Sequence, residues 1–186
     1  MKNERNWTFA TTAIVAGLTA LSAVATMLIR IPIPATTGYF NIGDVFVVLA
    51  GLWLGPLAGA LVGGIGPTLA DAIGFPVFIP ATMVTKGVEG FLVGLIASRA
   101  GENALGLRTA AAFIGGLTVV VGYFVFEAYI YPALGRFMPA FAITDIGAAI
   151  IEILPNSVQG VIGALGGLAL WKALSGYDPG KRSADR

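Results

Sequence analysis

A short apolar segment, residues 82–89, carries three side chains that could bind a ligand. Thr82, Lys86 and Glu89 stand at positions i, i+4 and i+7, which places them on one face of a helix. A lysine and a glutamate inside a segment suited to lipid cost free energy unless they pair, face a protein interior or contact a ligand. This face is therefore the first candidate for a binding site.

Two later segments carry polar or aromatic faces of the same kind. Their residues are Glu152, Asn156 and Gln159 at i, i+4 and i+7, and Tyr123, Glu127 and Tyr131 at i, i+4 and i+8. Three such faces suit a small, flat, polar ring, because aromatic side chains stack on the ring while amide and charged groups bind its edge.

The predicted substrate-binding set adds residues from the connections on the same side of the chain. The full set is Tyr39, Phe40, Asn41, Phe78, Lys86, Glu89, Tyr123, Glu127, Glu152, Asn156 and Gln159. The alternative is that these faces only hold helices together, with Lys86 neutralised by Glu89 or Glu152. Asp44 and Asp145 stand at predicted helix starts, where each could equally be a cap or a ligand contact.

Residue types needed for most catalysis and metal binding are missing from the sequence. It contains no Cys and no His, which removes thiolate and imidazole chemistry and the commonest metal ligands. Residues 63–66 (GGIG) lack the Gly-Lys-Ser/Thr ending of a phosphate-binding loop, and no serine has an evident base beside it. We therefore predict that the protein is not an enzyme and holds no cofactor or metal. ATP hydrolysis for any active transport would come from a partner.

The composition predicts that these residues lie in a membrane. Hydrophobic residues make up 56% of the chain, charged residues only 11%, and the mean hydropathy is +0.85. A chain of 186 residues holds roughly six spans of about 20 residues and no separate aqueous domain. Eleven basic against ten acidic residues give no reason to expect nucleic acid as a partner. We predict an all-α polytopic membrane protein with six transmembrane helices.

Hydropathy, with the positions of proline, glycine and charge, divides the chain into six spans. The predicted spans are residues 7–29, 41–54, 56–73, 81–98, 109–131 and 144–174. The second and third are short for a full crossing, and Pro155 predicts a kink in the last. The first could instead be a signal peptide, but it is longer than the apolar core of such peptides. Residues 1–174 are thus predicted to form one domain, followed by a polar cytoplasmic tail at 175–186.

Lysine and arginine residues indicate how the spans are oriented. Eight of them fall on the side of the amino terminus: Lys2, Arg5, Arg99, Arg108, Lys172, Lys181, Arg182 and Arg186. Only Arg30 and Arg136 fall on the other side, so the positive-inside rule places both termini in the cytoplasm. In this orientation the polar faces of the fourth and sixth spans lie roughly 8–18 Å below the outer surface. We therefore expect a pocket in the outer half of the membrane.

Small residues recur at a spacing of four. They are Gly51, Gly55, Gly59 and Gly63, the pair Gly90 and Gly94, and the pair Gly163 and Gly167. This spacing lets helix backbones approach closely, usually within one chain. Ala16 and Ala20 form a similar pair on the first span, which carries few other polar groups. That pair could instead dock another membrane protein.

Several motifs resemble those of the substrate-binding subunits, or S components, of energy-coupling factor (ECF) vitamin transporters. The matching segments are residues 38–44 (GYFNIGD), 54–60 (LGPLAGA), 63–71 (GGIGPTLAD) and 86–90 (KGVEG). The resemblance covers the first four spans closely and the last two by size and placement. It implies six helices in a prokaryotic cell membrane, cytoplasmic termini, and an outer pocket closed by the loops after the first and third spans.

The same resemblance implies partners and a transport cycle. Ala16 and Ala20 would dock on a membrane coupling (T) subunit that carries two ATPase subunits, and the S component would topple to carry its vitamin inward. Because the family's substrates differ widely, the resemblance does not name the ligand. Among vitamins, pyridine or pyrimidine compounds of the vitamin B6 and thiamine-precursor kind fit the polar and aromatic faces best, and riboflavin comes next. The residues alone leave two other functions open. One is a stand-alone facilitator or ion-coupled secondary transporter of a small polar solute, and the other is a lipid enzyme, for which Glu102 supplies no paired acidic motif.

Overall fold

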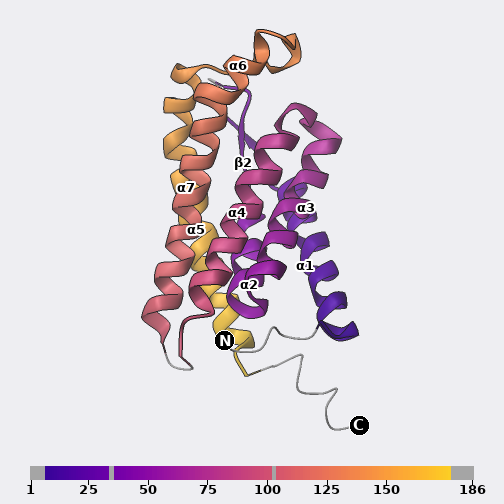
Figure 1. Cartoon of the computed structure of the whole chain (residues 1–186), viewed down its shortest axis with the longest axis vertical. Coiled ribbons are helices and arrows are strands. Elements are labelled where there is room, and N and C mark those ends of the chain that lie inside the picture. Colours follow the sequence, from indigo (N-terminus) through magenta and orange to yellow (C-terminus); the bar gives the residue numbers. More distant parts are fainter. Residues whose placement is uncertain (1–6, 34–35, 102–103, 177–186) are drawn as a thin grey trace.

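The computed structural model describes residues 7–33, 36–101 and 104–176, which form a helical bundle with a small hairpin inserted in it (Figure 1). The helices are α1 (Phe9–Leu28), α2 (Asp44–Leu54), α3 (Pro56–Gly74), α4 (Ile79–Ala97), α5 (Leu105–Val125), α6 (Tyr131–Gly135) and α7 (Ile146–Leu174). The hairpin consists of the strands β1 (Ile31–Pro32) and β2 (Tyr39–Phe40). The short turns are the 3₁₀ segments η1 (Pro76–Phe78) and η3 (Pro139–Phe141) and the π-helical segment η2 (Phe126–Ile130).

Within the described ranges, five helical segments are long and apolar enough to cross a membrane. They are α1, α3, η1 with α4, α5 continued through η2 and α6, and α7. Helix α2, which corresponds to the second predicted span, is apolar but has only 11 residues. The prediction of an all-α polytopic membrane protein is confirmed, with α2 as a shortened member of the bundle.

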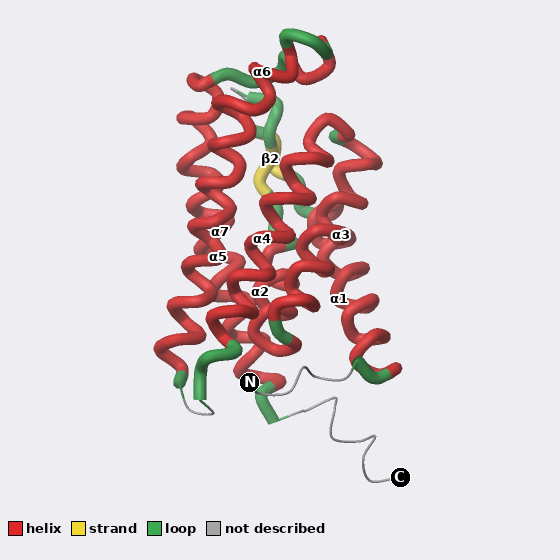
Figure 2. Tube along the Cα trace, viewed as in Figure 1, coloured by secondary structure: helices red, strands yellow, loops and turns green. Residues whose placement is uncertain are grey.

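The short helix α2 explains why the hairpin enters the bundle. Eleven residues at 1.5 Å each give about 16 Å, roughly half of a 30 Å hydrocarbon core. The strands pair antiparallel, with Ile31 opposite Phe40 and Pro32 opposite Tyr39, and residues 41–43 connect β2 to α2. Figure 2 shows the strands between the helices, beyond the first turn of α2. The hairpin thus occupies the part of the bundle that α2 leaves open.

Helices α3 and α4 pack with their backbones in contact, and glycines make this possible. A Cβ atom on Gly90 would lie 2.1 Å from the carbonyl oxygen of Gly59, and one on Gly94 would lie 2.4 Å from the carbonyl carbon of Gly55. Gly55 also has a φ of +97°, which side chains rarely permit, at the turn between α2 and α3. The glycine spacing in this region therefore serves packing inside the chain.

Substituting Gly90 by alanine is expected to lower the free energy of unfolding by about 1–3 kcal/mol, because the added methyl group overlaps the backbone of α3. Gly106→Ala in α5 is the matched control, since its Cβ would meet no atom within 4 Å. Thermal unfolding in detergent, followed by tryptophan fluorescence, measures both variants. Equal unfolding temperatures for the two would contradict the backbone contact.

Helix α7 approaches α5 and α2 in a similar way. A Cβ atom on Gly160 would lie 2.8 Å from the carbonyl oxygen of Gly116 in α5, and one on Gly163 would lie 2.7 Å from the Cβ of Asp44 in α2. These approaches bring the polar face of α7 next to the first turn of α2. The start of α2 and the middle of α7 therefore form one buried polar region.

Some element boundaries differ from the sequence prediction. Helix α5 begins at Leu105 rather than 109, and its helical path continues to Gly135, into a segment predicted to be a loop. Helix α4 begins at Ile79, two residues early, because Pro80 fits a first helical turn, where its missing N–H is not needed. Pro155 lies inside α7, which is helical throughout.

Basic residues of the described ranges lie at both ends of the bundle. Arg99 follows α4, Arg108 lies in the first turn of α5 and Lys172 in the last turn of α7, at the end of the bundle where α1 begins (Figure 1). Arg30 and Arg136 follow α1 and α6 at the opposite end. The other basic residues of the predicted cytoplasmic side and most of the predicted tail lie outside the described residues: Lys2, Arg5, Lys181, Arg182, Arg186 and 177–186.

Candidate binding site

A pocket lies in the half of the bundle that contains the hairpin. It holds about 320 Å³ of free space, counted together with the part that opens to solvent. Its lining residues are Gly38, Tyr39, Asn41, Asp71, Phe78, Thr82, Tyr123, Glu127, Glu152, Asn156 and Gln159. They come from the hairpin, the end of α3, the start of α4, the end of α5 with η2, and α7. Polar and aromatic side chains from five parts of the chain thus converge on one concave space, as they do in small-molecule sites.

Most of the predicted substrate-binding residues meet at this pocket. Those that line it are Tyr39, Asn41, Phe78, Tyr123, Glu127, Glu152, Asn156 and Gln159. Gly38, Asp71 and Thr82 also line it, although the predicted set omitted them. Thr82 shares a helical face with Lys86, so the spacing could have placed Thr82 in the predicted set. Gly38 could be found only from the fold, because its contact is with α7.

Phe40, Lys86 and Glu89 belong to the predicted set, but the structure does not place them at the pocket surface. Phe40 follows Tyr39 on a strand, so the two side chains point to opposite faces of the hairpin. Lys86 and Glu89 are fully buried, one and two turns further along α4 than Thr82. They lie beneath the pocket rather than in its wall.

Lys86 forms a buried ion pair with Asp44. Its Nζ lies 2.5 Å from both carboxylate oxygens of Asp44 and 3.8 Å from Oε2 of Glu89, and none of the three side chains is exposed. Of the two partners predicted from the sequence, Glu89 forms this second, longer ion pair with Lys86, whereas Glu152 forms no salt bridge with it. Asp44 reaches Lys86 because α2 begins in the middle of the bundle. The sequence could not show this depth.

The two aspartates at helix starts have different roles. Asp44 makes no capping hydrogen bond to α2, since its carboxylate is engaged by Lys86. Asp145 caps α7, and its Oδ1 accepts a hydrogen bond of 2.8 Å from the backbone N–H of Ala148. Asp145 lies outside the pocket lining.

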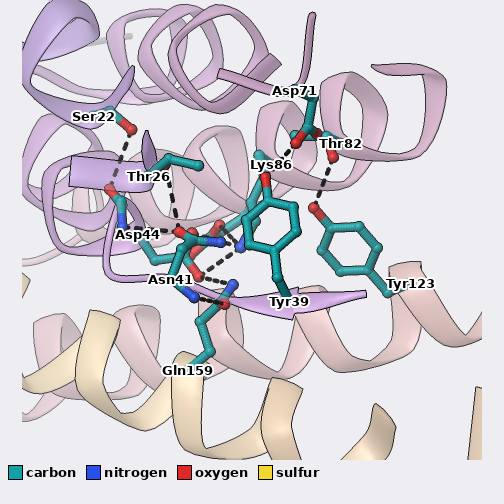
Figure 3. A network of polar contacts seen from close by, with 12 residues as sticks. Ser22, Thr26, Tyr39, Asn41, Asp44, Asp71, Thr82, Lys86, Tyr123 and Gln159 are labelled. Atoms are coloured by element: carbon teal, nitrogen blue, oxygen red, sulfur yellow. Dashed lines mark hydrogen bonds and ion pairs between the residues drawn. The ribbon is translucent and has the colours of Figure 1, made fainter. Parts of the chain in front are cut away.

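Gln159 connects the ion pair to the hairpin. Its Nε2 donates to Oδ2 of Asp44 at 2.9 Å, and its Oε1 accepts from the backbone N–H of Asn41 at 2.9 Å (Figure 3). Oδ1 of Asn41 accepts from the N–H of Gly43 at 2.9 Å and from the hydroxyl of Thr26 at 3.4 Å. The floor of the pocket is therefore one hydrogen-bonded unit that joins α1, α2, α7 and the end of the hairpin.

Tyr39 and Arg30 hold the hairpin against the end of α3. The Tyr39 hydroxyl donates to Oδ1 of Asp71 (Figure 3). The Tyr39 ring lies 4.7 Å from the ring of Phe75. The Arg30 guanidinium lies 5.2 Å from the Tyr39 ring and donates to the carbonyl of Ala70 at 2.5 Å. Burial, together with the nearby Asp71 carboxylate, raises the pKa of Tyr39, so its hydroxyl stays protonated and serves as a donor.

Tyr123 of α5 supplies a second aromatic wall. Its hydroxyl lies 2.9 Å from the hydroxyl of Thr82 on α4 (Figure 3). Its ring lies 5.5 Å from Nζ of Lys86, so the cation beneath the pocket also contacts this wall. The pocket thus has aromatic rings from two different elements, Tyr39 and Tyr123.

Two carboxyl groups, Glu127 and Glu152, face each other in the pocket. Glu127 is 1% exposed and Glu152 is 4% exposed. Both oxygens of Glu127 and Oε1 of Glu152 have no hydrogen-bond partner among the described residues. Buried polar atoms in proteins normally have partners, and ionisable groups inside a membrane protein mark functional sites. These oxygens are the strongest sign that the pocket receives a ligand.

The π-helical segment η2 sets the direction of Glu127. Such segments insert an extra residue into a helix and often occur at functional sites. They also break the regular spacing, so Tyr131, predicted on the same face as Glu127, lies outside the pocket lining. Tyr131 is fully buried, and its hydroxyl donates to the carbonyl of Val77 at 2.9 Å.

The fold and the pocket define a small polytopic membrane protein whose helices surround a buried polar pocket. The family model described as "ECF-type riboflavin transporter, S component" matches residues 6–176, and the protein belongs to this family. The resemblance identified from the sequence motifs is thereby confirmed. The family is one of transporter subunits rather than enzymes. A Pyrococcus woesei protein described as "Uncharacterized protein in gap 3'region" is 39% identical over 147 residues, which cover 78% of this chain and 89% of that protein.

Proposed function

We propose that this protein is the substrate-binding subunit of an ECF-type importer and captures a small water-soluble vitamin or vitamin precursor from outside the cell. The observation that carries the proposal is the pocket with buried, unpartnered oxygens of Glu127 and Glu152 in a chain of the S-component family. Tyr39 and Tyr123 would stack on a flat ring, and Asn156 would bind its edge. A pyridine or pyrimidine vitamer or a riboflavin-like compound fits this arrangement.

In this proposal both termini lie in the cytoplasm and the pocket opens to the outside. The chain delivers its ligand by toppling on a T subunit driven by two partner ATPases, since it carries no nucleotide-binding motif of its own. Ala16 and Ala20 support this docking, because both are exposed on α1. Between them, a Cβ on Gly17 would meet no atom within 4 Å, so the face can receive another helix closely.

Calorimetric titration of the purified protein with a panel of B vitamins and their precursors tests the binding function. We expect at least one compound to bind with a Kd in the micromolar range or tighter. A panel without any such ligand would contradict the proposal. Uptake into liposomes that contain only this protein would instead favour the stand-alone facilitator.

Ala16→Trp and Ala20→Trp are expected to abolish co-purification of the T subunit and the ATPases while ligand affinity stays within about twofold. The indole would prevent close helix approach on α1, a face that is remote from the pocket lining. Ala110→Trp is the matched control, because Ala110 is also exposed but lies on α5. Affinity purification of the tagged protein from cells that make the partners measures the effect. Retention of the partners by both α1 variants would argue against docking through this face.

A further inference from the structure

The two cations nearest the site, Lys86 and Arg30, are both paired with groups other than the pocket glutamates. Lys86 lies beneath the pocket, 2.5 Å from Asp44. Arg30 lies over the Tyr39 ring and donates to the carbonyl of Ala70. Neither residue lines the pocket, and neither forms a salt bridge with a pocket glutamate.

Glu127 and Glu152 therefore lack a counter-charge. Each faces the other, and Glu152 also faces Thr36 and Gly38 of the hairpin, which carry no charge. Among the described residues, no lysine or arginine forms a salt bridge with either carboxyl. Two carboxylates held close together and away from water repel each other and lose hydration. A proton shared between the two carboxyls relieves the repulsion, and a positive charge placed between them would relieve both penalties.

We propose that the ligand of this pocket is a flat ring compound that carries a positive charge and N–H groups, with its charged edge held between Glu127 and Glu152. This inference rests on the proposed function and narrows its substrate class. Tyr39 and Tyr123 already contact the protein's own cations Arg30 and Lys86, so their part is to stack on the flat ring rather than to bind its charge. An anionic vitamin would add a like charge to the pair, and a neutral one would leave the carboxyls unmatched.

Calorimetric titration with charged and uncharged ring compounds tests the proposal. Pyridoxamine and pyridoxine share one ring and differ by an amine against a hydroxyl group, thiamine is permanently charged, riboflavin is neutral, and pantothenate is anionic. We expect thiamine or pyridoxamine to bind about 100-fold or more tightly than pyridoxine, riboflavin and pantothenate. This ratio is the worth of one to two charge-assisted hydrogen bonds.

Glu127→Gln and Glu152→Gln remove one charge each and keep the shape of the side chain. Each is expected to weaken binding of the preferred cation by roughly 10- to 100-fold. Asp145→Asn is the control, because it removes an acidic charge at the exposed start of α7 and preserves a capping side chain. Its affinity is expected to stay within about twofold. If a glutamine variant does not fold, the order of affinities of the charged and uncharged compounds for the unchanged protein still tests the proposal.

The outcomes separate the inference from the proposed function. Tight binding of riboflavin, pyridoxine or pantothenate, with weaker binding of both cations, overturns the charge inference and leaves the vitamin-binding function standing. Unchanged cation affinity in both glutamine variants also overturns it. Failure of every compound in the wider vitamin panel to bind overturns the proposed function as well.

Discussion

Replacing Lys86 by methionine is expected to lower the free energy of unfolding by about 3–5 kcal/mol. The substitution removes the ammonium group that faces both Asp44 and Glu89, and it leaves two fully buried carboxylates without a cation. It also frees the Asp44 oxygen that orients Gln159, so the pocket floor loses its anchor. Unfolding by sodium dodecyl sulfate in dodecyl maltoside micelles, followed by circular dichroism, measures the loss.

The partner substitution provides the control. Asp44→Asn is expected to cost less, about 1–3 kcal/mol, because Glu89 stays 3.8 Å from the ammonium and the amide can still accept from Gln159. The double variant Lys86→Met with Asp44→Leu is expected to be more stable than Lys86→Met alone, since it removes one of the two orphaned carboxylates. Losses below about 1 kcal/mol for both single variants would mean that the pair is not buried from water.

The sequence predicted the bundle because membrane helices must satisfy their own backbone hydrogen bonds and bury apolar residues. Long apolar runs therefore map directly onto α1, α3, α4, α5 and α7. The face of Glu152, Asn156 and Gln159 was also predictable, because α7 is regular where they lie and helical spacing holds there. These parts depend on local sequence alone.

Other parts of the site depend on how distant elements meet. The pairing of Lys86 with Asp44 follows from the depth in the bundle at which α2 begins. Residue spacing within α2 or α4 does not predict this depth. The prediction that Tyr131 lies on the same helical face as Glu127 was wrong for a different reason. The π-helical segment η2 shifts the helical phase just before Tyr131. The contact of Gly38 with Glu152 requires the hairpin to fold into the bundle first.

The shortness of α2 links these features. A second helix extended by further turns before Asp44 would fill the column that the hairpin now occupies. Because α2 begins halfway, backbone and side chains of the hairpin reach α3 and α7, and Tyr39 and Asn41 become part of the pocket. The hairpin is thus both a wall of the site and a consequence of the half-length helix.

Gly38 lies where the hairpin approaches the carboxyl group of Glu152. A Cβ atom there would lie 2.2 Å from Oε1 and 2.4 Å from Oε2 of Glu152, so any side chain must displace this carboxyl. Gly38→Val is expected to weaken ligand binding by roughly 10- to 100-fold, the affinity equivalent of the 1–3 kcal/mol typical of overpacking. Calorimetric titration with the vitamin that the unchanged protein binds measures the effect. The unfolding temperature should change little, because the displaced carboxyl can move into the free space of the pocket.

Two further variants separate the clash from a general effect on the hairpin. Thr37→Val places the same branched side chain at the neighbouring exposed position and is expected to leave affinity within about twofold. Gly38→Ala combined with Glu152→Asp shortens the carboxylate by one methylene group and should bind more tightly than Gly38→Ala alone. Full affinity in Gly38→Val would show that the hairpin does not rest against Glu152 when the ligand is bound. The carboxyl pair would then have to hold its ligand without support from the hairpin.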